Sequence, residues 1–381
     1  MKNQKSILIL FEPVNQTPLI KSLVVNMRKE GIAVDAWNVS RWEYVDSTTN
    51  GVVIDFILPV LRLFFSIPKA GTLFRRIVSY FMMRRSSSNY TAIDIHFFSP
   101  TYYRLLDSLI KTKKPYKLTI WGSDFYRTPQ KRKEKQRKYY SNAKIIHIGT
   151  EQMKEDFLLD FPTVADKIRL ARFGISQFDL IDRYRDKNSC TLLPVNEIKD
   201  KIVITCGYNG SVGQQHKLLI NAIGQLRGNQ KDKIVLLFPM TYGATKKYTD
   251  MILDLLSDLG ITYHIFTTHL SNEENAQLRV LTDIAVNIQV SDALSASLQE
   301  HLCAGNLLLA GDWLPYRVFD EAGIFYKKTS IEKLSDTLSY CIDNIHSLKE
   351  KTKDNPTKIK TLSSWKAVSP VWATIYKELL D

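Results

Sequence analysis

The chain has 381 residues, of which 44% are hydrophobic and 24% are charged. These values are ordinary for a globular protein and exclude a disordered chain, a collagen-like repeat and a polytopic membrane protein. The charge is unusual, because 52 Lys and Arg against 39 Asp and Glu leave a net +13. Residues 1–190 hold 32 basic and 18 acidic residues and carry a net charge of +14, whereas residues 191–381 carry a net charge of −1. The basic half therefore favours an anionic partner, such as nucleic acid, an anionic membrane or a phosphorylated substrate.

Short apolar, β-branched runs recur along the chain and are separated by segments of helical length. Because the run after Met1–Lys5 is only about six residues long, it indicates a first strand and not a signal peptide. Alternation of continuously apolar strands with helices is typical of parallel sheets buried on both faces. We therefore predict an α/β chain with doubly wound sheets. Because a single core rarely exceeds about 300 residues, the ten predicted strands are divided into two series of five, one for each domain. The predicted strands are 7–11, 33–39, 93–99, 117–122, 144–149, 202–207, 234–239, 261–267, 284–290 and 307–311.

Segment 56–68 departs from this pattern, because it is apolar apart from Arg62. It is too short to span a bilayer. Basic residues follow it at Lys69, Arg75, Arg76, Arg84 and Arg85. Apolar bulk next to basic residues indicates an interfacial segment on an anionic membrane, and the alternative is a buried helix pair with a solvated end.

The predicted domains are 1–190, 191–360 and a terminal segment, 361–381. A polar linker at 182–200 coincides with the step in charge. The final helix, 363–380, either crosses back to the first domain or caps its own. The four cysteines are widely spaced without Cys-x-x-Cys, which argues against zinc or a disulfide scaffold and favours a reduced, cytosolic protein.

The loop 206–217 joins a predicted strand to a predicted helix at 218–226. Glycines 207, 210 and 213 allow backbone N–H groups to approach an anion at the start of that helix. His216 and Lys217 are expected to add positive charge. The spacing is neither G-x-G-x-x-G nor a Walker A loop, so a flexible loop is a competing interpretation.

A second junction, 291–305, places Asp292 in a loop and Glu300 eight positions later, before Gly305 and another strand. This arrangement resembles the Glu-x7-Glu signature of retaining glycosyltransferase family four, with Asp in place of the first Glu. The resemblance implies that Asp292 lies beside the donor sugar and that Glu300 hydrogen-bonds the ribose. An N-cap Asp and a solvated helical Glu are the alternative.

Other segments carry the same resemblance, which covers most of the chain. Residues 120–124, 148–153 and 172–175 resemble the family's "His-Gly-Ser/Thr-Asp", "S-E-x-x" and "N-G-I/V-D" runs. Where the family places Arg and Lys to hold the diphosphate, this chain has Asn209 and Gln214. Loop 207–216 and segment 238–243 instead resemble bacterial N-acetylfucosaminyltransferases. Both resemblances imply the GT-B fold, with two Rossmann-like domains facing a central cleft.

The resemblance assigns residues to three groups. The catalytic candidates are Asp292, Glu300, His216 and Asp124. The donor-binding candidates are Gly207, Tyr208, Asn209, Gly210, Gln215, His216, Lys217, Tyr242, Gly243, Ser295, Ser297 and Glu300. The candidates on the acceptor side are Trp121, Gly122, Ser123, Asp124, His96 and Arg172.

The implied reaction is transfer of a hexose-type sugar from a nucleotide diphosphate donor. The chain contains no Asp-x-Asp, so we expect neither metal nor cofactor, and a helix N-terminus with cations would stabilise the leaving group. Family four implies retention, with the leaving phosphate taking the acceptor proton. Inversion would require a base such as Asp124 or His96.

The expected acceptor is a glycan or polyprenyl-linked glycan in bacterial surface polysaccharide synthesis. The expected location is cytoplasmic and peripheral, on the inner face of the cell membrane. The basic run 131–138 adds charge to the first domain, although such runs are commonly solvated helix faces. Three alternatives stay open: a nucleic-acid-binding protein, a nucleotide-sugar epimerase on a GT-B fold, and an inactive scaffold.

Overall fold

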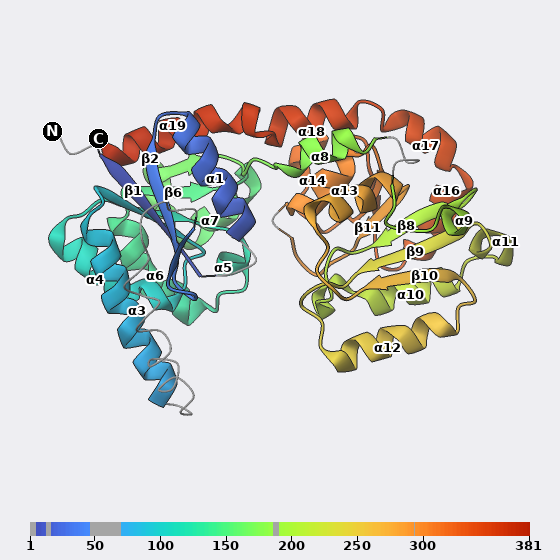
Figure 1. Cartoon of the computed structure of the whole chain (residues 1–381), viewed down its shortest axis with the longest axis horizontal. Helices are drawn as coiled ribbons and strands as arrows, with labels where there is room; N and C mark the ends of the chain where they lie inside the picture. Colours follow the sequence, from blue (N-terminus) through green and yellow to red (C-terminus); the bar gives the residue numbers. More distant parts are fainter. Residues whose placement is uncertain (1–4, 13–16, 46–69, 186–189, 293) are drawn as a thin grey trace. The chain divides into compact units, whose positions relative to one another are not determined.

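The structure, a computed structural model, describes residues 5–12, 17–45, 70–185, 190–292 and 294–381. It contains two compact units (Figure 1). Unit 1 is Met1–Gly174 with Trp365–Asp381, and unit 2 is Ile175–Ser364. The chain therefore leaves unit 1 once and returns to it for its final helix. The interfacial segment expected at 56–68 lies outside the described residues.

Unit 1 is built on a seven-stranded sheet in the order β3-β2-β1-β4-β5-β6-β7. Its strands are β1 (Ser6–Phe11), β2 (Ala33–Asn38), β3 (Glu43–Val45), β4 (Ala92–His96), β5 (Tyr116–Thr119), β6 (Ile145–Ile148) and β7 (Ile168–Leu170). All neighbours are parallel except β2 and β3. Ile7 pairs with Val34 of β2 and with Ala92 of β4, so the strand order reverses beside β1. Such a reversal is typical of a doubly wound sheet.

Helices cover both faces of this sheet. They are α1 (Thr17–Lys29), α3 (Ala70–Ser88), α4 (Tyr103–Thr112), α5 (Ser123–Tyr126), α6 (Gln130–Asn142), α7 (Glu151–Asp160) and α19 (Trp365–Leu380). One core cluster joins the sheet to α3, α4, α6 and α7, through residues such as Leu106 and Phe157. A second cluster joins it to α1 and α19, through Leu23 and Trp372. The end of the chain is thus part of the core of unit 1.

Unit 2 has a six-stranded sheet in the order β10-β9-β8-β11-β12-β13. The strands are β8 (Ile202–Cys206), β9 (Ile234–Pro239), β10 (Thr262–Phe266), β11 (Ile284–Asn287), β12 (Leu307–Gly311) and β13 (Lys327–Thr329). Every neighbouring pair is parallel. This is the 3-2-1-4-5-6 order of a Rossmann sheet, with the reversal between β8 and β11.

The helices of unit 2 also form two layers. They are α8 (Gln177–Arg183), α9 (Val195–Ile198), α10 (His216–Gly224), α11 (Gly228–Lys231), α12 (Lys246–Ser257), α13 (Asn272–Leu281), α14 (Ala296–Cys303), α15 (Arg317–Glu321), α16 (Leu334–Asp343), α17 (Ile345–Lys351) and α18 (Asn355–Ser363). One core cluster includes α10, α12 and α16. The other includes α8, α13 and α14.

The predicted α/β class with two doubly wound sheets is confirmed, and each of the ten predicted strands overlaps an observed one. The prediction missed β3, β7 and β13, which are three residues each and too short to show a pattern. It also extended β4 to residue 99, whereas the strand ends at His96. Phe97 has a φ of 61°, a left-handed conformation that interrupts a strand. Among the described residues, no helix is long and apolar enough to cross a membrane.

Candidate functional site

The candidate site lies at the carboxyl ends of β8 and β11 in unit 2. The strand order reverses here, and doubly wound sheets bind their ligands beside such a reversal. The loops after these two strands are joined, because the Val290 amide donates to the Gly213 carbonyl at 2.9 Å. The Gly207 amide donates to the Val286 carbonyl at 3.0 Å. The two sequence junctions identified at 206–217 and 291–305 therefore begin side by side.

Glycine is required in the loop after β8. Gly207 has a φ of 69°, and a Cβ there would lie 2.8 Å from Oε1 of Gln214. A Cβ at Gly210 would lie 2.4 Å from Cβ of Ala244, in the loop after β9. The Gly210 amide donates to the Tyr242 carbonyl at 2.7 Å, and Gly243 has a φ of 82°. The loops after β8 and β9 are thus held together with no space for an added side chain.

Gln289 connects the two sides of the reversal. Its Oε1 accepts a hydrogen bond from Gln214 Nε2 at 2.9 Å and another from the Tyr208 hydroxyl at 3.1 Å. Its backbone carbonyl accepts from Trp313 Nε1 at 2.9 Å. The side chains of Gln214 and Gln289 are both buried. Gln289 was not among the predicted site residues, and its signal in the sequence was a polar residue near the end of an apolar run.

His216 differs from its predicted role as a cation. The residue is 1% exposed, its ring packs edge-on against Phe238, and Nδ1 lies 3.2 Å from the Tyr248 hydroxyl. Burial lowers the pKa of His216 to about 4. The imidazole is therefore neutral near pH 7, so the expectation that it adds positive charge is wrong. It can still form a hydrogen bond as a neutral ring.

The remaining loop candidates surround the start of α10. Asn209 Oδ1 accepts from the Ser211 amide at 2.8 Å and shapes the loop. Gln215 has a left-handed φ of 60° before the first helical residue, and its Nε2 donates to the Ile288 carbonyl. The Lys217 side chain is exposed in the first turn. The positive charge at this helix start thus comes from Lys217 and the backbone N–H groups.

Asp292 is held from two directions. Its Oδ2 accepts from the Ser295 amide at 3.1 Å and from the Tyr316 hydroxyl at 2.5 Å. Ser295 is the N-cap residue of α14, so the first contact holds the Asp292 carboxylate just before the helix begins. Tyr316 lies after β12, and no feature of the sequence indicated that it meets Asp292.

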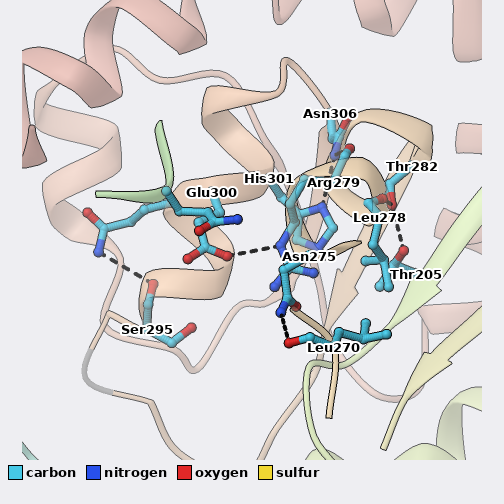
Figure 2. A network of polar contacts seen from close by, with 12 residues as sticks. Thr205, Leu270, Asn275, Leu278, Arg279, Thr282, Ser295, Glu300, His301 and Asn306 are labelled. Atoms are coloured by element: carbon cyan, nitrogen blue, oxygen red, sulfur yellow. Dashed lines mark hydrogen bonds and ion pairs between the residues drawn. The ribbon is translucent and has the colours of Figure 1, made fainter. Parts of the chain in front are cut away.

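Glu300 forms an ion pair with Arg279 of α13, as Figure 2 shows. Arg279 Nε donates to Glu300 Oε2 at 3.1 Å, and the two side chains are 6% and 14% exposed. The same network contains His301, whose Nδ1 lies 2.9 Å from Nδ2 of Asn306 (Figure 2). Sequence reasoning missed Arg279, because its position in an amphipathic helix does not reveal its partner.

Two serine hydroxyls lie at the start of α14. The Oγ atoms of Ser295 and Ser297 are buried and have no hydrogen-bond partner within the described part of the chain. The side-chain Nε2 atoms of Gln289 and His216 are also buried without a hydrogen-bond partner among the described residues. Buried polar atoms in folded proteins are normally paired, so these four atoms at the ends of β8 and β11 and the start of α14 are open to contacts with a ligand.

In unit 1, Asp124 braces the turn that carries several acceptor-side candidates. Its Oδ1 accepts from the amides of Trp121 and Gly122, and its Oδ2 accepts from the Phe98 amide, each at 2.9 Å. Burial raises the pKa of Asp124 to about 6, although these N–H donors act in the opposite direction. Gly122 has a φ of 114°, and Ser123 begins α5. These contacts favour a structural role for Asp124.

His96 lies within the core of unit 1. It is 0% exposed, and its Nε2 lies 2.9 Å from Oδ2 of Asp94. Burial lowers the pKa of His96, despite its contact with the Asp94 carboxylate. This environment also favours a structural role for His96.

The other acceptor-side candidates gather near the carboxyl end of the same sheet. The Trp121 ring lies 4.5 Å from the Phe173 ring, measured between centroids. The Arg172 carbonyl accepts from Trp372 Nε1 of α19 at 2.7 Å. No group of three or more His, Cys, Asp or Glu with metal-binding geometry occurs among the residues that the structure describes.

Known structures resemble the whole chain, although no family model and no curated protein sequence matches it. The Anabaena protein HepE, crystallised with UDP and glucose, gives a TM-score of 0.69 at 10% identity over 98% of this chain and 99% of its own. Sucrose-phosphate synthase from Thermosynechococcus elongatus gives a TM-score of 0.72 at 13% identity, over 98% of this chain and 99% of its own. A UDP-forming trehalose-phosphate synthase from Burkholderia xenovorans gives a TM-score of 0.66 at 11% identity, over 99% of this chain and 98% of its own.

These similarities and the two parallel Rossmann-like sheets define the GT-B fold for this chain. The comparisons support the GT-B part of the resemblance seen in the sequence. They do not test its closer likeness to glycosyltransferase family four or to the N-acetylfucosaminyltransferases.

Proposed function

We propose that the protein is a glycosyltransferase that moves a hexose-type sugar from a nucleotide diphosphate donor to a glycan or lipid-linked acceptor. The supporting observation is the set of unpartnered buried polar atoms at the reversal of the unit 2 sheet. They adjoin the starts of α10 and α14, where backbone N–H groups favour a diphosphate. HepE, which shares the fold, has been crystallised with UDP-glucose. Bacterial surface polysaccharide is the proposed pathway, on the basis of the sequence resemblance alone.

In this proposal unit 2 binds the donor. Asp292 lies beside the sugar, and Glu300 contacts the ribose while Arg279 holds its carboxylate. The first turn of α10, with Lys217, holds the diphosphate. Ser295 and Ser297 supply the hydroxyls that now lack partners, and neutral His216 supplies a ring nitrogen.

The proposed chemistry is retaining and independent of a metal. The bond from the anomeric carbon to the diphosphate breaks, and the new glycosidic bond forms on the same face of the sugar. The departing phosphate oxygen accepts the proton of the acceptor hydroxyl. The helix N-termini and Lys217 then stabilise the developing negative charge of the leaving group. The sequence offers no Asp-x-Asp for a metal-assisted alternative.

Unit 1 is proposed to face an anionic membrane, which would place the protein on the inner face of the cell membrane. Helix α6 exposes Lys131, Arg132 and Lys135, and α3 exposes Arg84 and Arg85. Phe81, on the same helix as these two arginines, is 60% exposed. Exposed cations with apolar side chains suit the headgroup region of an anionic bilayer.

A thermal-shift panel of UDP, GDP, dTDP, ADP and CMP tests the donor assignment. We expect one nucleoside diphosphate to raise the melting temperature, because a ligand that binds only the folded state stabilises it. Incubation with the matching sugar donor, followed by product analysis, separates the activities. Isomerised donor in the absence of acceptor would indicate the epimerase alternative. A chain that binds none of these nucleotides would contradict the proposal.

A further inference from the structure

Tyr316 joins the end of β11 to the candidate loop of Asp292. Its hydroxyl lies 2.5 Å from Asp292 Oδ2 and 2.6 Å from Asn287 Nδ2, and the residue is 1% exposed. Asn287 is the last residue of β11 and is also 1% exposed. The three side chains are therefore joined by consecutive hydrogen bonds, from the end of β11 to the carboxylate in the loop.

The direction of these hydrogen bonds follows from the groups involved. An amide nitrogen can only donate, so the Tyr316 hydroxyl accepts from Asn287. Its single proton is then directed to Asp292. The reverse orientation of the Asn287 amide would place two acceptors against one hydroxyl proton, which is unfavourable. Burial raises the pKa of Tyr316 far above its ordinary value, so the hydroxyl keeps its proton at neutral pH.

The loop that carries Asp292 needs such an anchor. Leu294 has a φ of 71°, a left-handed conformation that is costly for a side chain of this type. Strained residues persist where their surroundings hold them in place. The Ser295 amide holds Asp292 from within the loop, whereas Tyr316 holds it from the segment after β12.

We propose that Tyr316 is a positioning residue that orients the Asp292 carboxylate toward the donor sugar. Asn287 in turn fixes the orientation of the Tyr316 hydroxyl. This inference rests on the proposed glycosyltransferase function, and it adds to that function a residue outside the two loops that the sequence resemblance identified.

The test uses the full chain and measures release of the nucleoside diphosphate from its sugar donor with water as acceptor. UDP-glucose is the first donor used, and the donor of whichever nucleotide the panel selects replaces it if UDP does not bind. Tyr316→Phe removes only the hydroxyl and retains the ring that packs against Phe319. A hydrogen bond to a charged group is among the stronger ones, so we expect kcat to fall about 10- to 100-fold. The KM for the donor should stay within about threefold, because the proposed site places Asp292 beside the sugar and the nucleotide against other residues. Tyr326→Phe is the matched control, since Tyr326 also packs against Phe319.

Two further measurements separate positioning from a merely structural effect. Loss of the donated hydrogen bond disfavours the ionised carboxylate, so the acid side of the kcat profile should move to higher pH in Tyr316→Phe. In an Asp292→Asn background, Tyr316→Phe should change kcat by less than about threefold, because both substitutions affect one interaction. Melting temperatures show whether either variant is unfolded.

The outcomes are distinct. Equal activity of Tyr316→Phe and wild type, an unmoved pH profile, or fully additive effects with Asp292→Asn would overturn the positioning role while leaving the transferase intact. A wild-type chain that binds no nucleotide of the panel would contradict the donor assignment, and this inference with it.

Discussion

Tyr376 donates a hydrogen bond of 2.7 Å to Oδ2 of Asp94, although 282 positions separate the two residues. The same oxygen lies 2.8 Å from Lys117 Nζ and 2.9 Å from His96 Nε2. All of these side chains are buried, and Lys117 Nζ lies 4.6 Å from the centroid of the Trp372 ring. Helix α19 is thus tied to the unit 1 sheet by a buried charged network as well as by apolar packing.

Tyr376→Phe should therefore destabilise unit 1. The ring keeps its packing, but the buried Asp94 carboxylate loses one donor, which we expect to reduce the free energy of unfolding by about 1–3 kcal/mol. Urea denaturation measures the change. Tyr263→Phe, in β10 of unit 2, is the control for loss of a tyrosine hydroxyl. Equal stability of Tyr376→Phe and wild type would mean that the apolar contacts alone hold α19.

The buried His216 should make stability depend on pH. Because burial lowers its pKa from 6.5 to about 4, the unfolded chain takes up a proton before the folded chain does. The stability that neutral His216 provides is therefore complete above pH 6.5 and is lost as the pH falls toward 4. His216→Gln should flatten this part of the curve in urea unfolding. His269→Gln, at an exposed histidine, should leave the curve as in wild type.

Glu300 should be tested with two substitutions, because it is paired with a buried arginine. Glu300→Ala leaves the Arg279 charge without this carboxylate, whereas Glu300→Gln keeps an oxygen for Arg279 Nε. We expect both variants to lose sugar transfer and Glu300→Ala to be less stable than Glu300→Gln by about 1–3 kcal/mol. Glu273→Ala, exposed on α13, is the control. A fully active Glu300→Ala enzyme would refute the assigned donor role.

Gly210→Ala should disrupt the loop after β8, which belongs to the proposed donor site. Its new Cβ would lie 2.4 Å from Cβ of Ala244, so the loops after β8 and β9 must separate. We expect nucleotide affinity to fall at least about tenfold, a loss of 1.4 kcal/mol or more in binding, measured by calorimetry. Gly228→Ala is the matched control, because nothing lies within 4 Å of its Cβ. If both variants bind nucleotide as wild type does, the loop is not part of the donor site.

The exposed cations of α6 should support membrane binding. Combined replacement of Lys131, Arg132 and Lys135 by Gln should lower the affinity for phosphatidylglycerol vesicles by about 100-fold, because each charge contributes about 1 kcal/mol to binding. Sedimentation with the vesicles measures this affinity. Higher salt should have the same effect on wild type. Replacement of Lys233, Lys246 and Lys247 in unit 2 removes the same charge and is the control. An identical loss in both triple variants would show that only net charge matters.

Much of the fold and the position of the two loops of the proposed donor site could be predicted from local patterns. Apolar runs such as 202–207 and 284–290 predict buried parallel strands, because a strand buried on both faces needs apolar residues at every position. Glycines 207 and 210 mark a tight loop, and the spacing of Asp292 and Glu300 marks a second junction. Each of these signals lies within a short segment, so the order of the residues is enough to reveal it.

The tertiary structure decided which side chains meet and which of them are charged. Tyr316 meets Asp292, Arg279 meets Glu300 and Tyr376 meets Asp94, and no local pattern links the members of these pairs. Burial also makes His216 neutral, although a histidine beside a glycine-rich loop suggested a cation. The physical reason is that periodicity depends on neighbouring residues, whereas hydrogen-bond partners and pKa values depend on residues that folding brings together.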